Sequence, residues 1–344
     1  MFTYKPWLLY GATGRTGTLI AEEAVARGHR PILAGRDPDR LRRLAERLDL
    51  TWAAGPATEL ARRIGDARLV LLAAGPFGTT APPVLRACLD AGVHYLDIAN
   101  EIPVAVAALA ADNEARQRGI TVLPAVGFGT VASDGLARYV ADQVPGASRL
   151  DLAILPSTDG SSAGAKASTM QALASGGRIR RDGRLVRKRL GAGARRQRTP
   201  IGDRTLVPVP TGDLVVTGHT TGIPDITVSF PVPMPPAAAQ LAMPALPVLA
   251  WAAGKRPQRA TPSGSATKAS ATADSYLWAR ATAADGRTAQ AWARTGEGYA
   301  YTARAAVLAV EATLRTDPLG ATTVARAFGP ELSFEAGGEL LAEA

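Results

Sequence analysis

Residues 7–17 read Trp-Leu-Leu-Tyr-Gly-Ala-Thr-Gly-Arg-Thr-Gly, a short apolar run that enters a glycine-rich turn. An alanine-rich helical pattern follows from about Arg15 to Arg27. Glycines permit a tight turn and let backbone N–H groups approach phosphates, and a helix N-terminus adds partial positive charge. The stretch therefore predicts a cradle for a dinucleotide pyrophosphate, built from Gly11, Ala12, Thr13, Gly14, Arg15, Thr16 and Gly17.

The spacing G-x-x-G-x-x-G is a weak signal in a chain with 35 glycines, so the neighbouring residues decide its meaning. Gly28 is placed to end the helix, and Pro31–Ala34 has the pattern of a second buried strand. Asp37 and Pro38 are suited to cap and begin another helix, which runs to about Leu48. Strand, turn, helix and strand thus fit in about thirty residues, the length of one βαβ unit.

Arg36, 25 residues after Gly11, indicates which dinucleotide is bound. An acidic residue at the end of the second strand would bind the ribose 2′-OH of NAD, whereas a guanidinium suits a 2′-phosphate. Arg15 and Arg40 are placed to reach the same phosphate, and Asp37 is interpreted as a helix cap that turns away from it. The sequence therefore favours NADPH over NADH.

Length and composition exclude several classes of protein. The chain has 344 residues, enough for two domains, and 47% of them are hydrophobic. It has one cysteine, Cys88, so no internal disulfide is expected. Three separate histidines and no metal-ligand spacing predict no metal site. Residues 1–5 are followed by no apolar segment typical of a signal peptide, so a cytoplasmic protein is expected.

The net charge of +9 lies in one segment. Residues 178–198 hold nine arginines, Lys188 and one acid, Asp182, whereas the remainder holds 29 basic and 29 acidic residues. The segment has no aromatic residue for stacking on bases, so no nucleic-acid partner is expected. Asp182-Gly183 predicts a hairpin turn between two short strands. The hairpin is either a solvated surface or a docking surface for an acidic partner, such as a carrier protein or a phosphorylated substrate.

Alternating strand and helix patterns continue to about residue 130, with strands at 68–74, 94–98 and 121–126 and helices at 82–91 and 102–118. We therefore expect an α/β fold, with a Rossmann-like doubly wound parallel sheet in residues 1–130. Ligands of such sheets bind at the carboxyl ends of the strands. The glycine turn, Arg36 and residues 75–78, 97–101 and 127–130 should meet there. Ala74, Gly75, Pro76 and Phe77 are the further residues expected to bind the coenzyme.

Beyond residue 130 we expect separate strands at 150–155, 206–209, 214–216 and 226–230 and a hairpin of 278–283 with 288–294. They indicate a second, α+β domain on a mixed or antiparallel sheet, residues 131–300, for substrate binding or oligomerisation. Residues 301–344 should form a helix and tail that pack on the first domain. Prolines interrupt the apolar residues 226–254, so no transmembrane span is expected. Two short helices there leave open a substrate cavity, a homodimer interface or a membrane surface.

Several segments in this order resemble the saccharopine dehydrogenase-like NADP-binding proteins, and most closely the trans-acting enoyl reductases. In the first half they are residues 11–17, 34–36, 74–77, 87–97 and 127–134, and in the second half residues 221–226 and 298–303. Three positions depart from the family pattern. Asn100 precedes Glu101 where the family has glycine, and Gly129 and Ala132 replace an acidic residue and a proline. These departures lie near the expected nicotinamide, so they bear on the substrate.

The resemblance implies an NADPH-dependent oxidoreductase of biosynthesis that reduces a C=C (enoyl) bond of a small or acyl-carrier-bound substrate. Two alternatives stay open: reduction of a C=N (imine) bond, and a non-catalytic NADP-binding partner protein. The protein must supply a proton donor. Tyr299 is the first candidate because it falls in a family segment, and His219 is the second. Tyr301, Tyr95 and Lys166 are further candidates.

Overall fold

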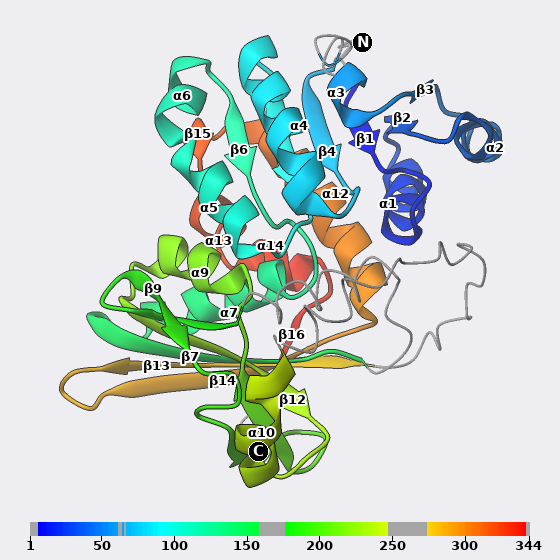
Figure 1. The fold of residues 1–344 in the computed structure, drawn as a ribbon. Coiled ribbons are helices and arrows are strands. Elements are labelled where there is room, and N and C mark those ends of the chain that lie inside the picture. The colour runs from blue at the N-terminus through cyan, green and yellow to red at the C-terminus, as the bar shows by residue number, and fades with distance from the viewer. Residues whose placement is uncertain (1–5, 61–63, 65–66, 158–175, 247–273, 342–344) are drawn as a thin grey trace.

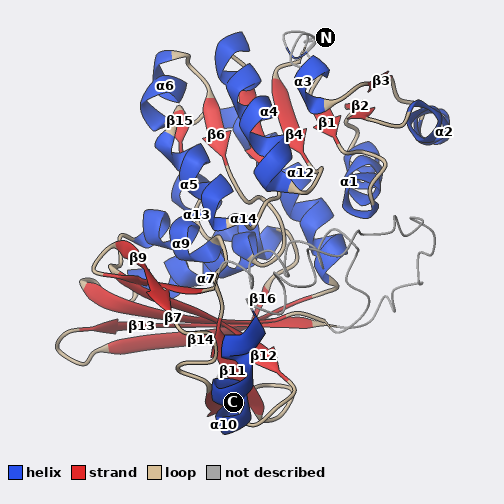
Figure 2. Ribbon diagram, viewed as in Figure 1, coloured by secondary structure: helices blue, strands red, loops and turns tan. Residues whose placement is uncertain are grey.

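The computed structural model describes residues 6–60, 64, 67–157, 176–246 and 274–341, which are arranged around two β-sheets (Figure 1). The first sheet has helices on both faces, and further helices lie between it and the second sheet (Figure 2). The loop after β6 (Thr121–Leu123) leads into α7 (Thr130–Asp142), which packs on the second sheet. The carboxyl ends of the first sheet's strands therefore face the second sheet.

Seven described strands form the first sheet, and all their pairings are parallel. They are β1 (Leu8–Tyr10), β2 (Ile32–Gly35), β3 (Trp52–Ala54), β4 (Leu69–Leu72), β5 (His94–Asp97), β6 (Thr121–Leu123) and β15 (Gly320–Ala321). Their order is β15-β6-β5-β4-β1-β2-β3. The chain thus builds outward from β1 in one direction and then from β4 in the other, which confirms the doubly wound fold. The direction reverses between β1 and β4, where such sheets bind ligands.

Two helical layers cover this sheet because its central strands are apolar on both faces. Leu9, Leu33 and Leu71 contribute to one core, which includes α1 (Arg15–Ala26), α2 (Pro38–Leu48) and α12 (Gly298–Thr316). Leu8 and Val70 contribute to the core on the other face, with α3 (Ala57–Leu60), α4 (Phe77–Ala91) and α5 (Ile102–Ala110). Successive strand residues point to opposite faces, so neighbouring leucines serve different layers.

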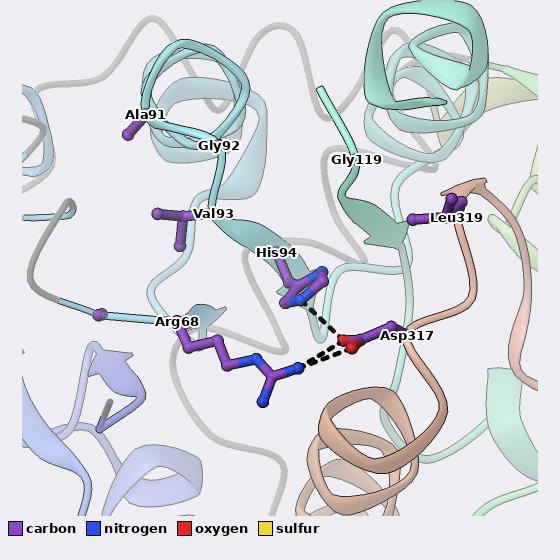
Figure 3. Close-up of a pocket in the computed structure, with 9 residues that line it drawn as sticks. Arg68, Ala91, Gly92, Val93, His94, Gly119, Asp317 and Leu319 are labelled. Carbon is purple, nitrogen blue, oxygen red and sulfur yellow. Dashed lines mark hydrogen bonds and ion pairs between the residues drawn. The ribbon is translucent and has the colours of Figure 1, made fainter. Parts of the chain in front are cut away.

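Helix α12 ends at the amino-terminal edge of the first sheet. Asp317, directly after the helix, pairs with Arg68 Nη2 at 2.7 Å and with His94 Nε2 at 3.2 Å (Figure 3). His94 Nδ1 accepts a hydrogen bond from the Thr121 amide at 2.9 Å, so Nε2 carries the proton of the neutral ring. Burial lowers the pKa of His94, against the opposing effect of Asp317. At this edge the charged groups therefore pair with one another.

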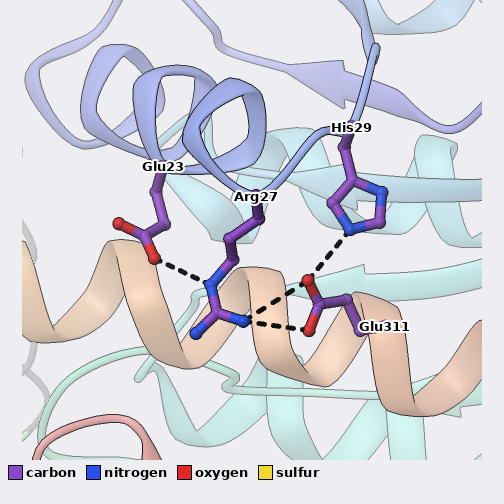
Figure 4. Close-up of polar contacts among 4 residues, drawn as sticks. All are labelled: Glu23, Arg27, His29 and Glu311. Carbon is purple, nitrogen blue, oxygen red and sulfur yellow. Dashed lines mark hydrogen bonds and ion pairs between the residues drawn. The ribbon is translucent and has the colours of Figure 1, made fainter.

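A second polar cluster fixes α12 against α1. Glu311 accepts a hydrogen bond from Arg27 Nη1 at 3.2 Å and lies 2.9 Å from His29 Nε2 (Figure 4). Glu23 holds the same arginine through its Nε at 2.8 Å. These contacts join a C-terminal helix to the end of the first helix of the chain.

Nine described strands form the second sheet. They are β7 (Ala147–Leu155), β8 (Gly177–Arg181), β9 (Arg184–Lys188), β10 (Arg195–Gln197), β11 (Arg204–Pro208), β12 (Asp225–Val232), β13 (Ser275–Ala283), β14 (Thr288–Thr295) and β16 (Glu339–Leu341). The β12–β7 pairing is parallel and the others are antiparallel, so the expected mixed sheet is confirmed. The hairpin of β8 and β9 turns at Asp182 and Gly183, both with positive φ.

The last part of the chain contributes to both sheets. Strand β15 adds an edge to the parallel sheet beside β6, whereas β16 pairs with β14 of the mixed sheet. Two short helices, α13 (Val324–Phe328) and α14 (Glu331–Glu335), connect them and pack on α7. The division of the chain at residues 130 and 300 stays a prediction.

Residues 214–216 form a helix, so the strand expected there is wrong. Leu214, Val215 and Val216 lie in α9 (Asp213–Thr221), which packs against α5, α7 and α13. The β-branched side chains of Val215 and Val216 favour a strand, but local propensity is weak beside the burial of almost every residue of this helix.

The long helix expected over residues 102–118 is divided in two. Helix α5 ends before Ala111, and α6 (Asp112–Gln117) begins directly after it. The Asp112 carboxylate accepts the Ala321 amide at 2.8 Å and pairs with Arg116 Nε at 3.0 Å. The first residue of α6 thus holds an edge strand from the other end of the chain, a contact that the local sequence does not reveal.

Residues 226–246 contain β12, α10 (Pro236–Ala242) and a 3-10 turn (Met243–Ala245), while residues 247–254 of the same apolar stretch lie outside the described residues. Ala239 and Met243 pack on Leu190 and Val207. None of the described helices has both the length and the apolarity that crossing a bilayer requires.

Candidate functional site

The turn after β1 is shaped by two glycines that no larger residue could replace without movement. Gly11 has φ +93°, and a Cβ there would lie 2.7 Å from the carbonyl carbon of Ala73 on the neighbouring strand end. A Cβ on Gly17 would lie 2.1 Å from the Gly11 oxygen. Gly14 is exposed, with a hypothetical Cβ 3.3 Å from the same oxygen. Gly11 and Gly17 therefore set the close packing of turn, strand and helix, and Gly14 faces outward.

Backbone hydrogen bonds hold the turn on the sheet and leave the start of α1 open. The amides of Gly11 and Ala12 both donate to Ala34 O, at 2.8 and 3.1 Å. Thr18 Oγ1 donates to Ala12 O at 3.1 Å. Within the described part of the chain, no side chain caps α1 at Gly14. An uncapped helix N-terminus beside glycines suits a bound phosphate, so the turn fits the pyrophosphate of a dinucleotide.

Arg36 is exposed directly after β2. Among the residues that the structure describes, no carboxylate lies within ion-pair distance of it. Its charge acts on the nearby Tyr10 hydroxyl, whose pKa is raised by burial and lowered in part by Arg36. A guanidinium beside the turn with no internal anion fits a 2′-phosphate.

Asp37 and Arg40 have structural contacts beside Arg36. The Asp37 carboxylate accepts the Arg40 amide at 3.0 Å, so it caps α2 as the sequence indicated. Arg40 Nη2 donates to Thr13 O at 2.9 Å and ties α2 to the glycine turn. Arg40 therefore supports the turn directly.

The segment Ala74–Phe77 follows β4 on the other side of β1. A Cβ on Gly11 would lie 2.8 Å from Ala74 Cβ, so this segment touches the glycine turn. Gly75 and Pro76, joined by a cis peptide bond, are exposed, and Phe77 begins α4 as a buried residue. Thr80 Oγ1 donates to Ala74 O at 2.5 Å and holds the segment's path. The structure thus brings the two predicted coenzyme segments together.

Asp97 is buried at the end of β5 and organises the next loop. Its oxygens accept the amides of Ala99 and Ala125, both at 2.9 Å, and the Tyr95 hydroxyl at 2.8 Å. Burial raises the pKa of Asp97 to about 6, although these hydrogen bonds favour the charged form. Asp97 and Tyr95 therefore shape the loops after β5 and β6.

The start of α12 lies against the glycine turn. Glu297 caps the helix, because its Oε2 accepts the amides of Tyr299 and Ala300, both at 2.9 Å. Its Oε1 lies 3.7 Å from Arg15 Nη2, and the Arg15 guanidinium lies 3.8 Å above the centre of the Tyr299 ring. Arg15 is thus directed toward α12. The sequence had instead placed it within reach of the 2′-phosphate.

The same helix start also contacts the loop after β6. A Cβ on Gly298 would lie 3.1 Å from the Phe128 ring, and the Phe128 amide donates to Thr302 Oγ1 at 2.9 Å. Since β4 and β5 lie between β1 and β6, Tyr299 and its neighbours span the strand ends where the nicotinamide half of a dinucleotide is bound in this fold. Sequence reasoning missed Glu297. The one signal in the sequence for this helix cap was an acidic residue directly before a helical pattern.

Among the other proton-donor candidates, two are engaged in the interior. Tyr301 is fully buried, donates to Ser333 O at 2.9 Å, and has its pKa raised by burial. Tyr95 is buried and bonded to Asp97. Lys166 lies outside the described residues.

His219 lies away from the glycine turn. It lines a pocket formed with residues of α6, β15 and α13, and no residue of the turn lines that pocket. The structure therefore brings Tyr299, but not His219, to the predicted coenzyme site. No cluster of three or more metal-binding side chains occurs among the described residues.

Comparison with known proteins identifies the first part of the chain. Residues 7–123 match the family model described as the saccharopine dehydrogenase NADP binding domain. A trans-acting enoyl reductase of Mycobacterium ulcerans is 33% identical over 141 residues, which cover 37% of this chain and 33% of that protein. A saccharopine dehydrogenase-like oxidoreductase of Arabidopsis thaliana is 30% identical over 163 residues, or 38% and 35% of the two chains. This chain thus spans about a third of the length of these relatives.

The whole fold has a counterpart among solved structures. Saccharopine dehydrogenase (L-Glu forming) of Saccharomyces cerevisiae superposes with a TM-score of 0.63 over 98% of this chain and all of the other, at 13% sequence identity. At that identity the likeness concerns the fold alone. The turn geometry, the open start of α1 and the family match agree on the ligand. Residues 7–123 are therefore similar to the saccharopine dehydrogenase NADP binding domain, and the coenzyme of this domain is NADP(H).

Proposed function

We propose that this protein is an NADPH-dependent reductase that acts on a C=C bond conjugated to a carbonyl, in a small or acyl-carrier-bound substrate. The similarity of its first third to trans-acting enoyl reductases supports the reaction class. The observation that carries the proposal is the position of Tyr299, which joins the glycine turn through Arg15 at the carboxyl ends of the parallel strands.

The glycine turn and Arg36 are the residues that hold the coenzyme in this proposal. The open N-terminus of α1 receives the pyrophosphate, and Gly11, Gly14 and Gly17 keep side chains out of its way. Arg36 pairs with the 2′-phosphate. When bound, the nicotinamide supplies a hydride to the carbon β to the carbonyl.

Tyr299 completes the reduction by giving its hydroxyl proton to the α carbon, and water then restores the phenol. The Arg15 guanidinium, 3.8 Å above the ring, stabilises the phenolate that forms during this transfer. Glu297 keeps both residues in place, because it caps α12 and pairs with Arg15. Tyr299 is therefore proposed as the catalytic acid, with Arg15 and Glu297 as positioning residues.

A substrate panel tests the reaction class. NADPH binding is first measured by fluorescence titration, so that an inactive preparation is recognised. Oxidation of NADPH is then followed with an enoyl thioester of a pantetheine analogue, and separately with the imine formed from a 2-oxoacid and an amine. Turnover of the thioester with formation of the saturated acyl group is the expected result.

The other outcomes reject the proposal in different ways. Turnover of the imine alone would assign C=N reduction in place of enoyl reduction. Tight NADPH binding with no turnover of either class would indicate a non-catalytic NADP-binding protein.

A further inference from the structure

A pocket distant from the glycine turn lies where the two sheets' helical layers meet. Its volume is about 220 Å³, and it is bounded by α6, β15, α9 and α13. Helix α6 belongs to the layer of the parallel sheet, whereas α9 packs on β12 and β8 of the mixed sheet. Its lining comprises Asp112, Arg116, His219, Pro318, Leu319, Ala321, Thr322, Arg326 and Ala327.

Two guanidinium groups enter this pocket with donors to spare. Arg116 uses Nε to pair with Asp112 at 3.0 Å, and Arg326 uses Nη1 to donate to His219 O at 2.9 Å. A guanidinium has five N–H donors, so each retains others for a ligand. In the described structure neither arginine pairs with any carboxylate except Asp112, whose second oxygen already accepts the Ala321 amide.

His219 adds a third group to the same space. Its ring is half-buried, and neither ring nitrogen has a hydrogen-bond partner among the described residues. Burial lowers its pKa, and the charges of Arg326 and Arg180 lower it further, whereas Asp112 raises it. The cations thus outweigh the single carboxylate in their action on the ring, which indicates a positive potential in the pocket.

We propose that this pocket binds a small anion with a carboxylate or phosphate group, held by Arg116 and Arg326, with His219 as a further hydrogen-bond donor. Paired guanidinium groups bind such oxyanions strongly because their N–H groups match the oxygens. The anion would contact α6 and α13 together with α9, so its binding would join the two helical layers and raise the free energy of unfolding. This inference does not depend on the reaction proposed above.

Nuclear magnetic resonance of the histidine rings tests the site directly, because the chain contains three histidines. Inorganic phosphate is titrated into protein saturated with NADP⁺, so that the glycine turn and Arg36 are already occupied. Sodium chloride at matched ionic strength is the control, and His219→Asn assigns the resonance. Phosphate should move the His219 signals saturably and raise the pKa of this imidazole, while chloride should not saturate.

Variants connect the signal to the pocket. Arg326→Ala and Arg116→Ala should each weaken the phosphate effect at least tenfold. Arg43→Ala, an exposed arginine on α2, should leave it unchanged. A His219 response that grows linearly with phosphate, or that is unchanged in Arg326→Ala, would overturn the proposal. If Arg326→Ala folds poorly, Arg326→Gln gives the same comparison with a neutral side chain of similar length.

Discussion

Similar charged groups have different partners at the two edges of the parallel sheet that the carboxyl and the amino ends of its strands form. At the carboxyl edge, Arg36 is exposed with no carboxylate within ion-pair distance among the described residues, and α1 begins without a side-chain cap. At the amino edge, Arg68 and His94 both pair with Asp317 (Figure 3). Arg36 and the start of α1 thus keep donors that a ligand could use, whereas Arg68 and His94 use theirs to hold the C-terminal part of the chain. The difference lies in the partners: Arg36 has no carboxylate partner among the described residues, whereas Arg68 is paired with Asp317.

The largest expected effect is a loss of NADPH affinity on substituting a glycine at the carboxyl edge, compared with a glycine at the amino edge. Gly17→Ala should weaken NADPH binding at least a hundredfold, because the new Cβ would lie 2.1 Å from Gly11 O. Gly92→Ala is the control at the amino edge. It has φ +67° and nothing within 4 Å, so it should lose only about 1 kcal/mol of stability and keep its affinity. Fluorescence titration and thermal unfolding measure both.

Gly14→Asp keeps this comparison decisive if Gly17→Ala does not fold. Aspartate is a favourable N-cap, so α1 should be preserved, but its charge should repel the pyrophosphate. A folded Gly14→Asp protein with native NADPH affinity would show that the coenzyme does not lie on this turn.

Arg36→Ala should give the next largest effect. Loss of the 2′-phosphate contact should raise the dissociation constant for NADPH about 10- to 100-fold, since a hydrogen bond to a charged group contributes roughly 1.5–3 kcal/mol. The NADH constant should hardly change. Arg43→Ala on the adjoining helix is the control. An equal loss for NADPH and NADH would show that Arg36 does not read the 2′-phosphate.

Tyr299→Phe should lower kcat at least tenfold with little change in NADPH affinity. Phenylalanine keeps the ring beneath Arg15, so the variant removes only the hydroxyl. Tyr301→Phe, two residues along, should lose about 1 kcal/mol of stability with its hydrogen bond to Ser333 and retain its kcat. Unchanged single-turnover rates in Tyr299→Phe would remove it from the mechanism.

The smallest effect concerns pH at the structural edge. Burial lowers the pKa of His94 in the folded protein, so the unfolded chain binds more protons near its ordinary pKa of about 6.5. The stability due to this neutral histidine is therefore present above that pH and is lost as the pH falls below it. Asp97 and Asp134, with pKa values raised to about 6, act in the opposite sense as the pH rises from 4 to 6.

The contribution of His94 is therefore measured as the difference in unfolding free energy between the wild type and His94→Asn. Denaturant unfolding of wild type and His94→Asn should show that the wild-type advantage shrinks as the pH falls from 7 to 5. NADPH affinity should be the same in both. A difference in unfolding free energy that is independent of pH would show that His94 does not titrate in this way.

Local signals sufficed where neighbouring residues decide the structure. The helix after the glycine turn, the Asp37 cap and the Asp182-Gly183 hairpin were all predicted, because turn, cap and hairpin preferences act over a few residues. Residues 214–216 were predicted wrongly because burial on all sides of α9 overrides their strand propensity. The break at Ala111 depends on Ala321, more than two hundred residues away.

The candidate site divides in the same way. The sequence by itself determined the glycine turn and the doubly wound sheet, because glycine spacing and hydrophobic periodicity are local properties. The phosphate cradle and the role of Arg36 stay predictions from the same residues. Only the tertiary structure placed Arg15 over Tyr299, buried Tyr301 and moved His219 to a separate pocket. These three outcomes depend on where α9 and α12 pack. The packing of α12 includes long-range contacts such as Glu311 with Arg27 and Asp317 with His94, which no window of sequence contains.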